Sequence, residues 1–390
     1  MSLPMPAEDP RHLPSRTVID PSAITQNTRA LGTLLEEHTA LMAVVKADGY
    51  GHGMLTAARA ALEGGATWLG VAHPASALAL HRAGLDAQIL TWLYEPVTAR
   101  AVLPDVIGAG IDVAVSSPQM LALVSEAAHQ VERRARVHLK IDTGMGRGGV
   151  MPWQVREVAI TIREDDFLGL TAAWTHMTSA EDPDDPATDQ QVETFDSACT
   201  LLEEIVGPIP LQHLANSALT LTRPDLHRDI VRPGIALYGY PPVPSEVPLR
   251  PAMTLTSRLA LVKEVPEGQS IGYSRTYHTT RTTRLGLVPL GYADGLHRAA
   301  SDRCHVLVRA EGGDQLAPQV GRISMDQIVI DLGPDSTAQA GDEVFLFGDA
   351  GGDPESPSAP SAEDWAVAAG TLPYEILTSI SGRVAREVRA

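Results

Sequence analysis

The sequence of 390 residues is short of cysteine and of positive charge. Two cysteines, Cys199 and Cys304, are too few for a disulfide scaffold or a thiolate zinc site, and they fit a reducing cytoplasm. With 30 Lys and Arg against 48 Asp and Glu, the formal net charge is −18. This balance excludes a nucleic-acid binder driven by charge and argues against adsorption to anionic membranes. We therefore predict a cytoplasmic protein with no metal site that binds neither nucleic acid nor membrane.

Long apolar runs are also absent. No stretch of about 18 apolar residues occurs, so the sequence predicts no membrane-spanning helix. The first 16 residues contain four prolines and lack the apolar segment of a secretory signal. We expect residues 1–16 to form a disordered N-terminal tail.

Two kinds of segment alternate between residues 17 and 250. Short apolar, β-branched runs are separated by stretches rich in Ala, Leu and Glu, whose apolar residues recur every three or four positions. Regular strand–helix alternation predicts a parallel sheet, and eight such units fit a closed (β/α)8 TIM-type barrel. A doubly wound open sheet is the main alternative, but no GxGxxG follows a strand. The expected strands are Met42–Lys46, Thr67–His73, Gln88–Leu93, Asp112–Ser117, Arg136–Thr143, Phe167–His176, Leu211–Ser217 and Ile230–Leu237.

The sequence pattern changes after about residue 250. Short β-like runs such as Leu259–Val265 and Arg284–Pro289 are punctuated by Gly and Pro, and long helices are missing until Asp364–Ile380. We predict that residues 251–390 form a C-terminal, mostly β domain, closed by a helix that is interrupted near Pro373.

The strongest local signal is AVVKADGYGHG, which ends a buried type of strand in Lys46 and continues into a glycine-rich turn. In a barrel, the carboxyl ends of the strands form the active-site face. A partly desolvated lysine at this position has a lowered pKa and can act as a nucleophile or base. The alternative is an ordinary solvated lysine at a strand end.

Other strands also end in polar groups. VHLKIDTGMGRGG places Lys140 within the fifth strand and Arg147 just beyond it, and the sixth strand ends in His176. The seventh strand ends in HLANS, with His213, and the eighth carries VRPGIALYG, with Arg232. Taken singly, each has a plain structural alternative: a lysine paired with a neighbouring aspartate, a core histidine or a surface ion pair. Together they predict one pocket.

That pocket contains the groups needed to hold an anion. Ser217 supplies a hydroxyl, and Gly234 and Ile235 supply backbone N–H groups after the eighth strand. Barrels commonly bind a phosphate at the loops after strands seven and eight. A phosphate site together with a reactive lysine indicates pyridoxal phosphate (PLP).

The motifs AVVKADGYGHG, KIDTGMGRGG, HLANS, VRPGIALYG, GYADG, GRISMDQ and LPYEI, in this order, resemble those of bacterial alanine racemases. The resemblance covers nearly the whole chain. It implies a PLP-dependent isomerase of fold type III, a homodimer with a barrel followed by a β domain. The expected activity is the interconversion of L-alanine and D-alanine, with D-alanine supplied for peptidoglycan of the cell wall.

The resemblance also implies roles for individual residues. Lys46 matches the lysine that forms the Schiff base and acts as one base, and Tyr273 in IGYSRTY matches the second base, contributed by the partner subunit. Arg232 matches the partner of the pyridine nitrogen. The residues that match the family's cofactor shell are Lys46, Tyr50, His176, Asn216, Ser217, Arg232, Gly234, Ile235 and Tyr374.

Further residues match substrate-binding and supporting positions. Arg147 matches the residue that binds the substrate carboxylate, and the N–H of Met325 from the partner subunit is expected to reach the same group. Lys140 matches a lysine that is carbamylated in many members and orients that arginine. The remaining supporting positions are His213, Tyr292 and Asp326.

One position departs from the family pattern, because Ser274 follows the tyrosine of IGYSRTY where glycine is often found. The change affects local backbone freedom and leaves Tyr273 in place.

These residue types suit racemisation, which removes a proton from one face of the α-carbon and returns one to the other. An amine and a phenol on opposite faces provide the two bases. Arginine only donates hydrogen bonds, so Arg232 is expected to keep the pyridine nitrogen unprotonated and to suppress transamination.

Two alternatives share the barrel and the lysine. A PLP-dependent decarboxylase of the same fold type would use an acidic group at the pyridine nitrogen and a reactive cysteine, which the sequence does not offer. A PLP-carrier protein would resemble the barrel alone. An amino-acid racemase of broader specificity also stays open, since the preference for alanine is implied by resemblance only.

Overall fold

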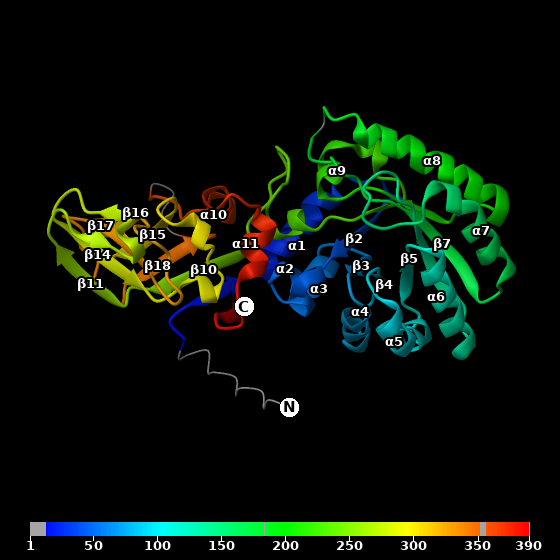
Figure 1. Cartoon of the computed structure of the whole chain (residues 1–390), viewed down its shortest axis with the longest axis horizontal. Helices are drawn as coiled ribbons and strands as arrows, with labels where there is room; N and C mark the ends of the chain where they lie inside the picture. Colours follow the sequence, from blue (N-terminus) through cyan, green and yellow to red (C-terminus); the bar gives the residue numbers. More distant parts are fainter. Residues whose placement is uncertain (1–12, 183, 352–355, 390) are drawn as a thin grey trace. The chain divides into compact units, whose positions relative to one another are not determined.

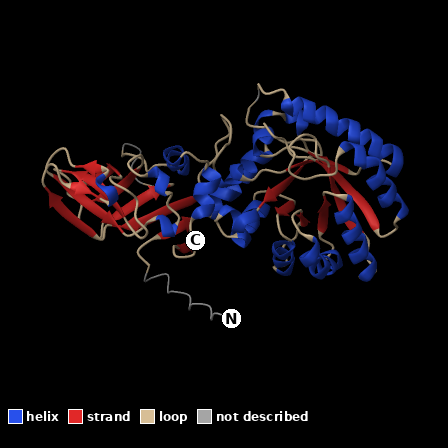
Figure 2. Ribbon diagram, in the orientation of Figure 1, coloured by secondary structure: helices blue, strands red, loops and turns tan. Residues whose placement is uncertain are grey.

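The structure is a computed structural model that describes residues 13–182, 184–351 and 356–389. The chain divides into two compact units. The first, called the barrel unit, comprises Ser22–Gly49 and Gly53–Arg250, and the second, called the sheet unit, comprises Met1–Pro21, Tyr50–His52 and Pro251–Ala390. Figure 1 follows the chain through both units, and Figure 2 shows that strands dominate the sheet unit.

Eight parallel strands form the sheet of the barrel unit, in the order β8-β7-β6-β5-β4-β3-β2-β9. Every predicted strand is present and begins within two residues of its expected start, which confirms the (β/α)8 prediction. The strands are β2 (Ala40–Val44), β3 (Trp68–Val71), β4 (Gln88–Thr91), β5 (Asp112–Val115), β6 (Ala135–Lys140), β7 (Leu168–Trp174), β8 (Leu211–His213) and β9 (Ile230–Val231).

The barrel closes between β8 and β9 through single hydrogen bonds. The N–H of Asp229 donates to the carbonyl of Gln212 at 3.1 Å, and the N–H of Arg232 donates to the carbonyl of Ala215 at 2.9 Å. β9 is much shorter than the predicted run to Leu237, because Pro233 has no N–H for a sheet ladder. The residues after Val231 are thereby released to form a loop at the carboxyl end of the barrel.

Helices follow the strands and cover the outside of the barrel, as Figure 2 shows. Pro74, Pro96 and Pro118 begin three of them, at a position where the missing N–H has no intrahelical partner anyway. The helices are α1 (Pro21–Gly32), α2 (Lys46–Tyr50), α3 (Met54–Glu63), α4 (Pro74–Arg82), α5 (Pro96–Gly108), α6 (Pro118–Gln130), α7 (Val155–Glu164), α8 (Ala187–Val206) and α9 (Ser217–Thr222).

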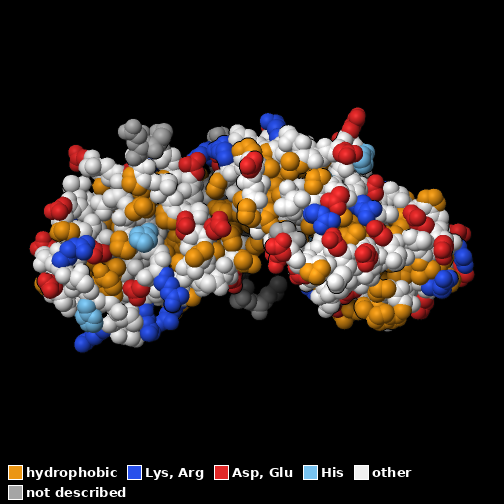
Figure 3. Space-filling view, turned by 90° about the horizontal axis from the view of Figure 1, so that it is seen from above, with side chains coloured by type: hydrophobic (Ala, Val, Ile, Leu, Met, Phe, Trp, Pro, Cys, Tyr) orange, Lys and Arg blue, Asp and Glu red, His pale blue; other side chains and the backbone are white. Residues whose placement is uncertain are grey.

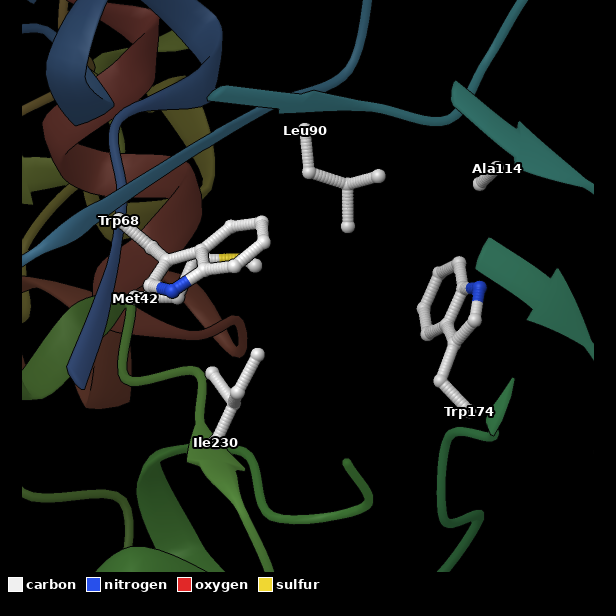
Figure 4. Packing of buried hydrophobic residues seen from close by; sticks show 6 residues of the cluster. All are labelled: Met42, Trp68, Leu90, Ala114, Trp174 and Ile230. Carbon is white, nitrogen blue, oxygen red and sulfur yellow. The ribbon is translucent and has the colours of Figure 1, made fainter. Parts of the chain in front are cut away.

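Side chains from alternate strand positions fill the barrel interior, as the period of two requires. A buried apolar cluster is formed by Met42, Trp68, Leu90, Ala114, Trp174 and Ile230. Figure 4 shows these side chains converging from different strands, with the two indole rings on different sides of the space. The cluster makes this part of the barrel a packed core.

The sheet unit contains a six-stranded sheet in the order β16-β15-β18-β10-β1-β19 and a three-stranded sheet in the order β11-β14-β17. A small pair, β12 with β13, completes it. The strands are β1 (Arg16–Ile19), β10 (Met253–Arg258), β11 (Leu261–Val265), β12 (Ser270–Ile271), β13 (Tyr277–His278), β14 (Thr283–Val288), β15 (His305–Ala310), β16 (Gly313–Pro318), β17 (Ile328–Gly333), β18 (Glu343–Phe347) and β19 (Ala385–Val388). The prediction of a mostly β C-terminal domain is confirmed.

The predicted C-terminal helix is divided in two. Its first part is α10 (Ala362–Ala369), which ends at Gly370 in a left-handed conformation, and its second part is α11 (Pro373–Ser379). Gly370 adopts the positive φ without strain, and Pro373 then starts the second helix.

The structure corrects two expectations about the first 21 residues of the chain. β1 pairs with β10 and β19, so residues 17–21 join the sheet unit although the sequence assigned them to the barrel. Residues 1–12 of the expected tail lie outside the described residues. Ser15 is buried and Arg16 begins β1, so the tail does not extend to residue 16.

Acidic and basic side chains are interspersed on the face of the molecule drawn in Figure 3. Basic side chains form small groups on that face, separated by acidic and uncharged ones.

Candidate active site

Lys46 begins a left-handed turn directly after the sheet. β2 ends at Val44, so Lys46 lies two residues beyond the strand rather than in it as predicted. Ala47, Asp48 and Tyr50 all have φ between 52° and 53°, a conformation that costs a non-glycine residue roughly 1–2 kcal/mol. The turn is fastened by the N–H of Gly49, which donates to the carbonyl of Val45 at 3.0 Å. Strain of this kind fits a functional segment.

The amine of Lys46 lies in a positive and partly dry environment. Burial lowers its pKa below the usual lysine value, and the charges of Arg147 and Arg232 lower it further. A lowered pKa increases the fraction of neutral amine at physiological pH, and the neutral amine is the form that acts as nucleophile or base.

Lys140 shares this environment. Burial and the charge of Arg147 lower its pKa to about 8, against an opposing effect of Asp142. Its Nζ lies 5.3 Å from the centre of the Trp174 ring. The predicted alternative, a simple ion pair with Asp142, is not formed, because Asp142 Oδ1 instead accepts from the N–H groups of Gly144 and Gly146.

Arg232 is buried and held from several sides. Its Nη2 donates to the carbonyls of Thr175 at 2.9 Å and Leu214 at 3.1 Å, and its Nη1 lies 3.2 Å from Nδ1 of His213. Its guanidinium carbon lies 5.2 Å from the centre of the Trp174 ring. Among the described residues no carboxylate forms an ion pair with Arg232, so the alternative of a surface ion pair does not apply.

His176 follows β7 and is partly buried. Its Nδ1 lies 3.4 Å from Nη2 of Arg232. Burial lowers its pKa to about 3, with further lowering by the positive charges of Arg232 and Arg147. The imidazole is therefore neutral at physiological pH, so it links to Arg232 without adding positive charge.

A small polar cradle lies after β8 and β9. The buried Ser217 hydroxyl oxygen accepts from the N–H of Gly234 at 2.9 Å and more distantly from that of Ala236, which leaves its proton to donate. The N–H of buried Ile235 has no acceptor in the described part of the chain. Asn216 caps α9 by accepting from Leu219 N–H at 3.1 Å. An unpaired buried N–H beside a donating hydroxyl fits an anion.

Tyr50 and Tyr374 form a second pair of predicted cofactor residues, and both belong to the sheet unit. Their ring centres are 6.1 Å apart. Burial raises the pKa of the Tyr50 phenol above its usual value, and the neighbouring Tyr374 adds to this. The Tyr50 phenol is therefore a neutral hydrogen-bond donor near neutral pH.

Tyr273 is exposed, with 66% of its surface accessible. It begins a short 3-10 turn, Tyr273–Arg275, in which Ser274 has φ of 61° and Arg275 has φ of 51°. The serine at the departure from the family pattern therefore occupies a conformation that glycine would adopt without strain. The structure does not bring Tyr273 together with other site residues within its unit.

Met325 and Tyr292 are also exposed in the sheet unit, at 53% and 41%. Two backbone segments meet tightly here, because the N–H of Tyr292 donates to the Ser324 carbonyl at 3.0 Å. A Cβ at Gly291 would lie 2.4 Å from the carbonyl oxygens of Ser324 and Met325, so only glycine fits. This contact fixes the loop that carries Met325.

Asp326 is held by an arginine rather than by a site residue. Arg383 Nη2 donates to Asp326 Oδ1 at 2.6 Å, and Arg383 Nε lies 3.3 Å from Asp294 Oδ1. Arg383 therefore ties Asp326 to Asp294 within the sheet unit.

Three polar residues of β5 and β6 were missed by sequence reasoning. Asp112 and His138 are fully buried, and Arg136 is bonded to Asp112. A signal was present: Arg136, His138 and Lys140 alternate with apolar residues along β6, which places all three on one face of the strand.

The chemistry of the barrel site fits a negatively charged cofactor that reacts with an amine. Lys46 offers a nucleophile, Ser217 and Ile235 offer donors to an anion, and Arg232 offers a buried donor without a carboxylate partner. No cluster of His, Cys, Asp and Glu among the described residues could hold a metal ion.

Comparisons with known proteins show the family of the chain. Residues 19–242 match the family model "Alanine racemase, N-terminal domain", and residues 252–388 match "Alanine racemase, C-terminal domain". The chain belongs to the alanine racemase family. An alanine racemase of Thermobifida fusca is 46% identical over 376 residues, covering 94% of this chain and 96% of that protein. One of Streptomyces coelicolor is 44% identical over 387 residues, covering 96% and 95%.

Solved structures of alanine racemases share the fold. The enzyme from a D-cycloserine-producing Streptomyces lavendulae superimposes with a TM-score of 0.89 at 42% identity, over 97% of each chain. An alanine racemase from Bacillus anthracis with bound L-Ala-P gives a TM-score of 0.85 at 31% identity, over 97% of this chain and 96% of that one. Alanine racemases are PLP-dependent isomerases and are typically dimeric. In the described part of the chain, no helix is both long and apolar enough to cross a bilayer.

Proposed function

We propose that this chain racemises alanine, interconverting the L and D enantiomers with PLP as cofactor. The observation that carries the proposal is the environment of Lys46, an amine with a lowered pKa beside Arg147 and Arg232 at the carboxyl end of a barrel. Membership of the alanine racemase family supports the same activity. A same-fold decarboxylase is not favoured, because the buried group next to His213 is the arginine Arg232 and not a carboxylate.

Several residues besides Lys46 would hold the cofactor. Ser217 and the N–H of Ile235 would bind its phosphate, and the N–H of Gly234, which donates to Ser217 Oγ in this structure, would turn to the same anion. Asn216 is next to Ser217 in the chain. Tyr50 and Tyr374 would add phenol donors, and His176 would act beside Arg232. When bound, PLP supplies a conjugated ring that accepts the electron pair of the α-carbon.

Proton transfer is assigned to two groups. The neutral Nζ of Lys46 takes or returns the proton on one face of the α-carbon, and the phenol oxygen of the partner subunit's Tyr273 does so on the other face. The exposure of Tyr273 in its own chain supports a role at a neighbouring subunit.

Arg232 sets the electronic character of the site. Burial lowers its pKa only to about 9, so it is positively charged at neutral pH and can only donate a hydrogen bond. A donor at this position would leave the ring nitrogen of the cofactor unprotonated, which would limit electron withdrawal and disfavour transamination.

Substrate binding is assigned to Arg147, which is exposed and can pair with a carboxylate, and to the N–H of Met325 from the partner subunit. Lys140 would orient Arg147 if its amine is carbamylated, and its lowered pKa of about 8 favours that reaction because carbon dioxide adds to the neutral amine. Tyr292 and Asp326 would support the approach to the site, and His213 supports Arg232.

The assembly and setting follow from the same proposal. A homodimer is needed because the second base comes from another copy of the chain. A cytoplasmic location and the supply of D-alanine for peptidoglycan fit the acidic chain and its two free, buried cysteines.

The test is incubation of the purified chain with PLP and L-alanine, followed by chiral chromatography. The proposal predicts D-alanine until the two enantiomers are equal in amount. Release of carbon dioxide and ethylamine would indicate the decarboxylase, and unchanged L-alanine would contradict both. Parallel assays with L-serine measure how strictly alanine is preferred.

A further inference from the structure

A row of four polar side chains crosses the interior of the barrel. Asp112 Oδ2 lies 2.9 Å from Nε2 of His138, and Nδ1 of His138 lies 2.9 Å from Nε2 of His213. Nδ1 of His213 lies 3.2 Å from Nη1 of Arg232. Asp112 begins β5, at the amino end of the barrel strands, whereas His213 and Arg232 lie at the carboxyl end. The row therefore connects the two ends of the barrel.

The proton positions in this row have one consistent direction. A guanidinium has no acceptor, so Arg232 must donate to Nδ1 of His213. The His213 proton then lies on Nε2 and is donated to Nδ1 of His138. The His138 proton lies on Nε2 and is donated to the Asp112 carboxylate. Both imidazoles are neutral, and each ring nitrogen has a partner.

The surroundings shield this row of side chains from solvent. Asp112, His138 and His213 have no accessible surface. The Trp68 ring lies edge-on to His138 with centres 5.5 Å apart, and the Trp174 ring stacks on His213 at the same separation. Burial also lowers the pKa of His213 well below its usual value, which agrees with a neutral ring. In such surroundings hydrogen bonds polarise one another more strongly than in water.

The charges at the two ends of the row are opposite. Arg232 is buried, and its direct partners are carbonyls and imidazoles. Asp112 is a buried carboxylate, and its second partner is Arg136, whose Nε lies 2.5 Å from Oδ1. The Asp112 charge reaches Arg232 only through the two imidazoles.

We propose that Asp112 and His138 are positioning residues for the racemase reaction, which fix the tautomer of His213 and thereby the place and charge of Arg232. The proposal rests on the function proposed above. Through the row, the carboxylate increases the electron density on Nδ1 of His213, so this atom accepts more strongly from Arg232. Arg232 is then preorganised to donate to the ring nitrogen of the cofactor.

A purely structural role for Asp112 would be a tie between β5 and β6 at the amino end of the barrel. That role requires its bonds to Arg136 and His138 but no defined proton on His213. It also predicts that losing Asp112 and altering Arg232 have independent effects, since the two residues do not touch.

The first experiment uses the wild-type full chain and does not depend on catalysis. Selective 15N labelling of histidine and long-range 15N–1H correlation spectra distinguish Nδ1–H from Nε2–H tautomers. We expect neutral Nε2–H tautomers for both His138 and His213, assigned with His138→Asn and His213→Asn variants. A proton on Nδ1 of His213, or a doubly protonated ring, would overturn the proposal whether or not the protein racemises alanine.

The second experiment is a double-mutant cycle on PLP affinity, measured by absorbance titration of full-length variants. Asp112→Asn keeps the shape of the side chain and removes its charge. We expect it to weaken PLP binding roughly ten-fold in the wild-type background but less than about two-fold in an Arg232→Lys background. Equal losses of PLP affinity in both backgrounds would show that Asp112 has a structural role only, and would contradict the proposal.

The matched control for this cycle is Asp331→Asn in the sheet unit. Asp331 is also a buried carboxylate, and it accepts from Thr283 and lies 3.5 Å from Arg281. Its loss is expected to reduce stability without coupling to Arg232→Lys. If Asp112→Asn fails to fold, the wild-type tautomers still decide the question.

Discussion

In the barrel unit, Arg232 and His213 are almost fully buried and hydrogen-bonded, whereas in the sheet unit Tyr273 and Met325 expose 66% and 53% of their surfaces. Burial shifts the pKa of Lys46 in the barrel unit, and the charges of Arg147 and Arg232 add to that shift. The sheet-unit residues project from short turns into solvent. The difference supports the proposal that one chain builds the cofactor half of the site and presents the other half to a partner.

The largest loss of activity in the barrel unit is expected when Lys46 is replaced. Lys46→Ala removes the amine that is proposed to hold the cofactor and to move a proton, so racemisation should fall by at least about 1000-fold. Reduction with borohydride followed by mass spectrometry should then find no cofactor attached to the chain. The sequence contains only two other lysines, Lys140 and Lys263, and exposed Lys263→Ala is the matched control that should keep both properties.

Tyr273 tests the exposed half of the site. Tyr273→Phe should slow exchange of the α-proton from one enantiomer by about 100-fold or more and affect the other much less, because each base serves one face. Isotope washout from L- and D-alanine measures the two directions separately. Tyr277→Phe, four residues along the same segment, should change neither, and an equal loss in both directions for Tyr273→Phe would contradict one base per face.

The positive charge around Lys46 predicts how the attachment of PLP depends on pH. Attachment of PLP requires the neutral amine, so its rate should rise with pH and level off above the lowered pKa of Lys46. Arg147→Met removes one of the charges that lower this pKa, so the midpoint should move to higher pH. Absorbance after mixing apo-protein with PLP measures the rate across pH. A midpoint that stays in place would show that Arg147 does not act on Lys46.

The smallest effect is expected at Ser274. Its φ of 61° strains a serine, and Ser274→Gly should stabilise the sheet unit by about 0.5 kcal/mol after the entropy of glycine in the unfolded chain is subtracted. Urea unfolding measures this change. Ser270→Gly in β12, where the residue lies in a strand, should instead lower the stability of the sheet unit. A loss of stability in both variants would contradict the argument that Ser274 is strained.

Much of the barrel was predictable because apolar strands and Ala-rich helices alternate at regular intervals, so the eight strand starts were found. The strand ends were not, since Lys46 and the residues after Val231 leave the sheet through a left-handed turn and a proline. β1 was assigned to the wrong unit because its partners, β10 and β19, lie more than 200 residues away in the sequence.

The candidate site was predictable where motifs follow a strand, as for Lys46, Ser217 and Arg232. The alternation along β6 places His138 on one face of the strand. Its bonds to Asp112 in β5 and to His213 in β8, on which the proposed role depends, are encoded by no local pattern. The proposed approach of Tyr273 to a second subunit depends on a surface that the sequence does not describe.

The most direct test of the two-subunit site is to mix two inactive variants, Lys46→Ala and Tyr273→Phe, after partial unfolding and refolding together. In a mixed dimer, one site combines Lys46 of one copy with Tyr273 of the other, so random pairing should restore about one quarter of wild-type activity. Each variant refolded alone should stay inactive. A mixture that recovers no activity, although mixed dimers are detected by mass spectrometry, would contradict the sharing of the site between two copies.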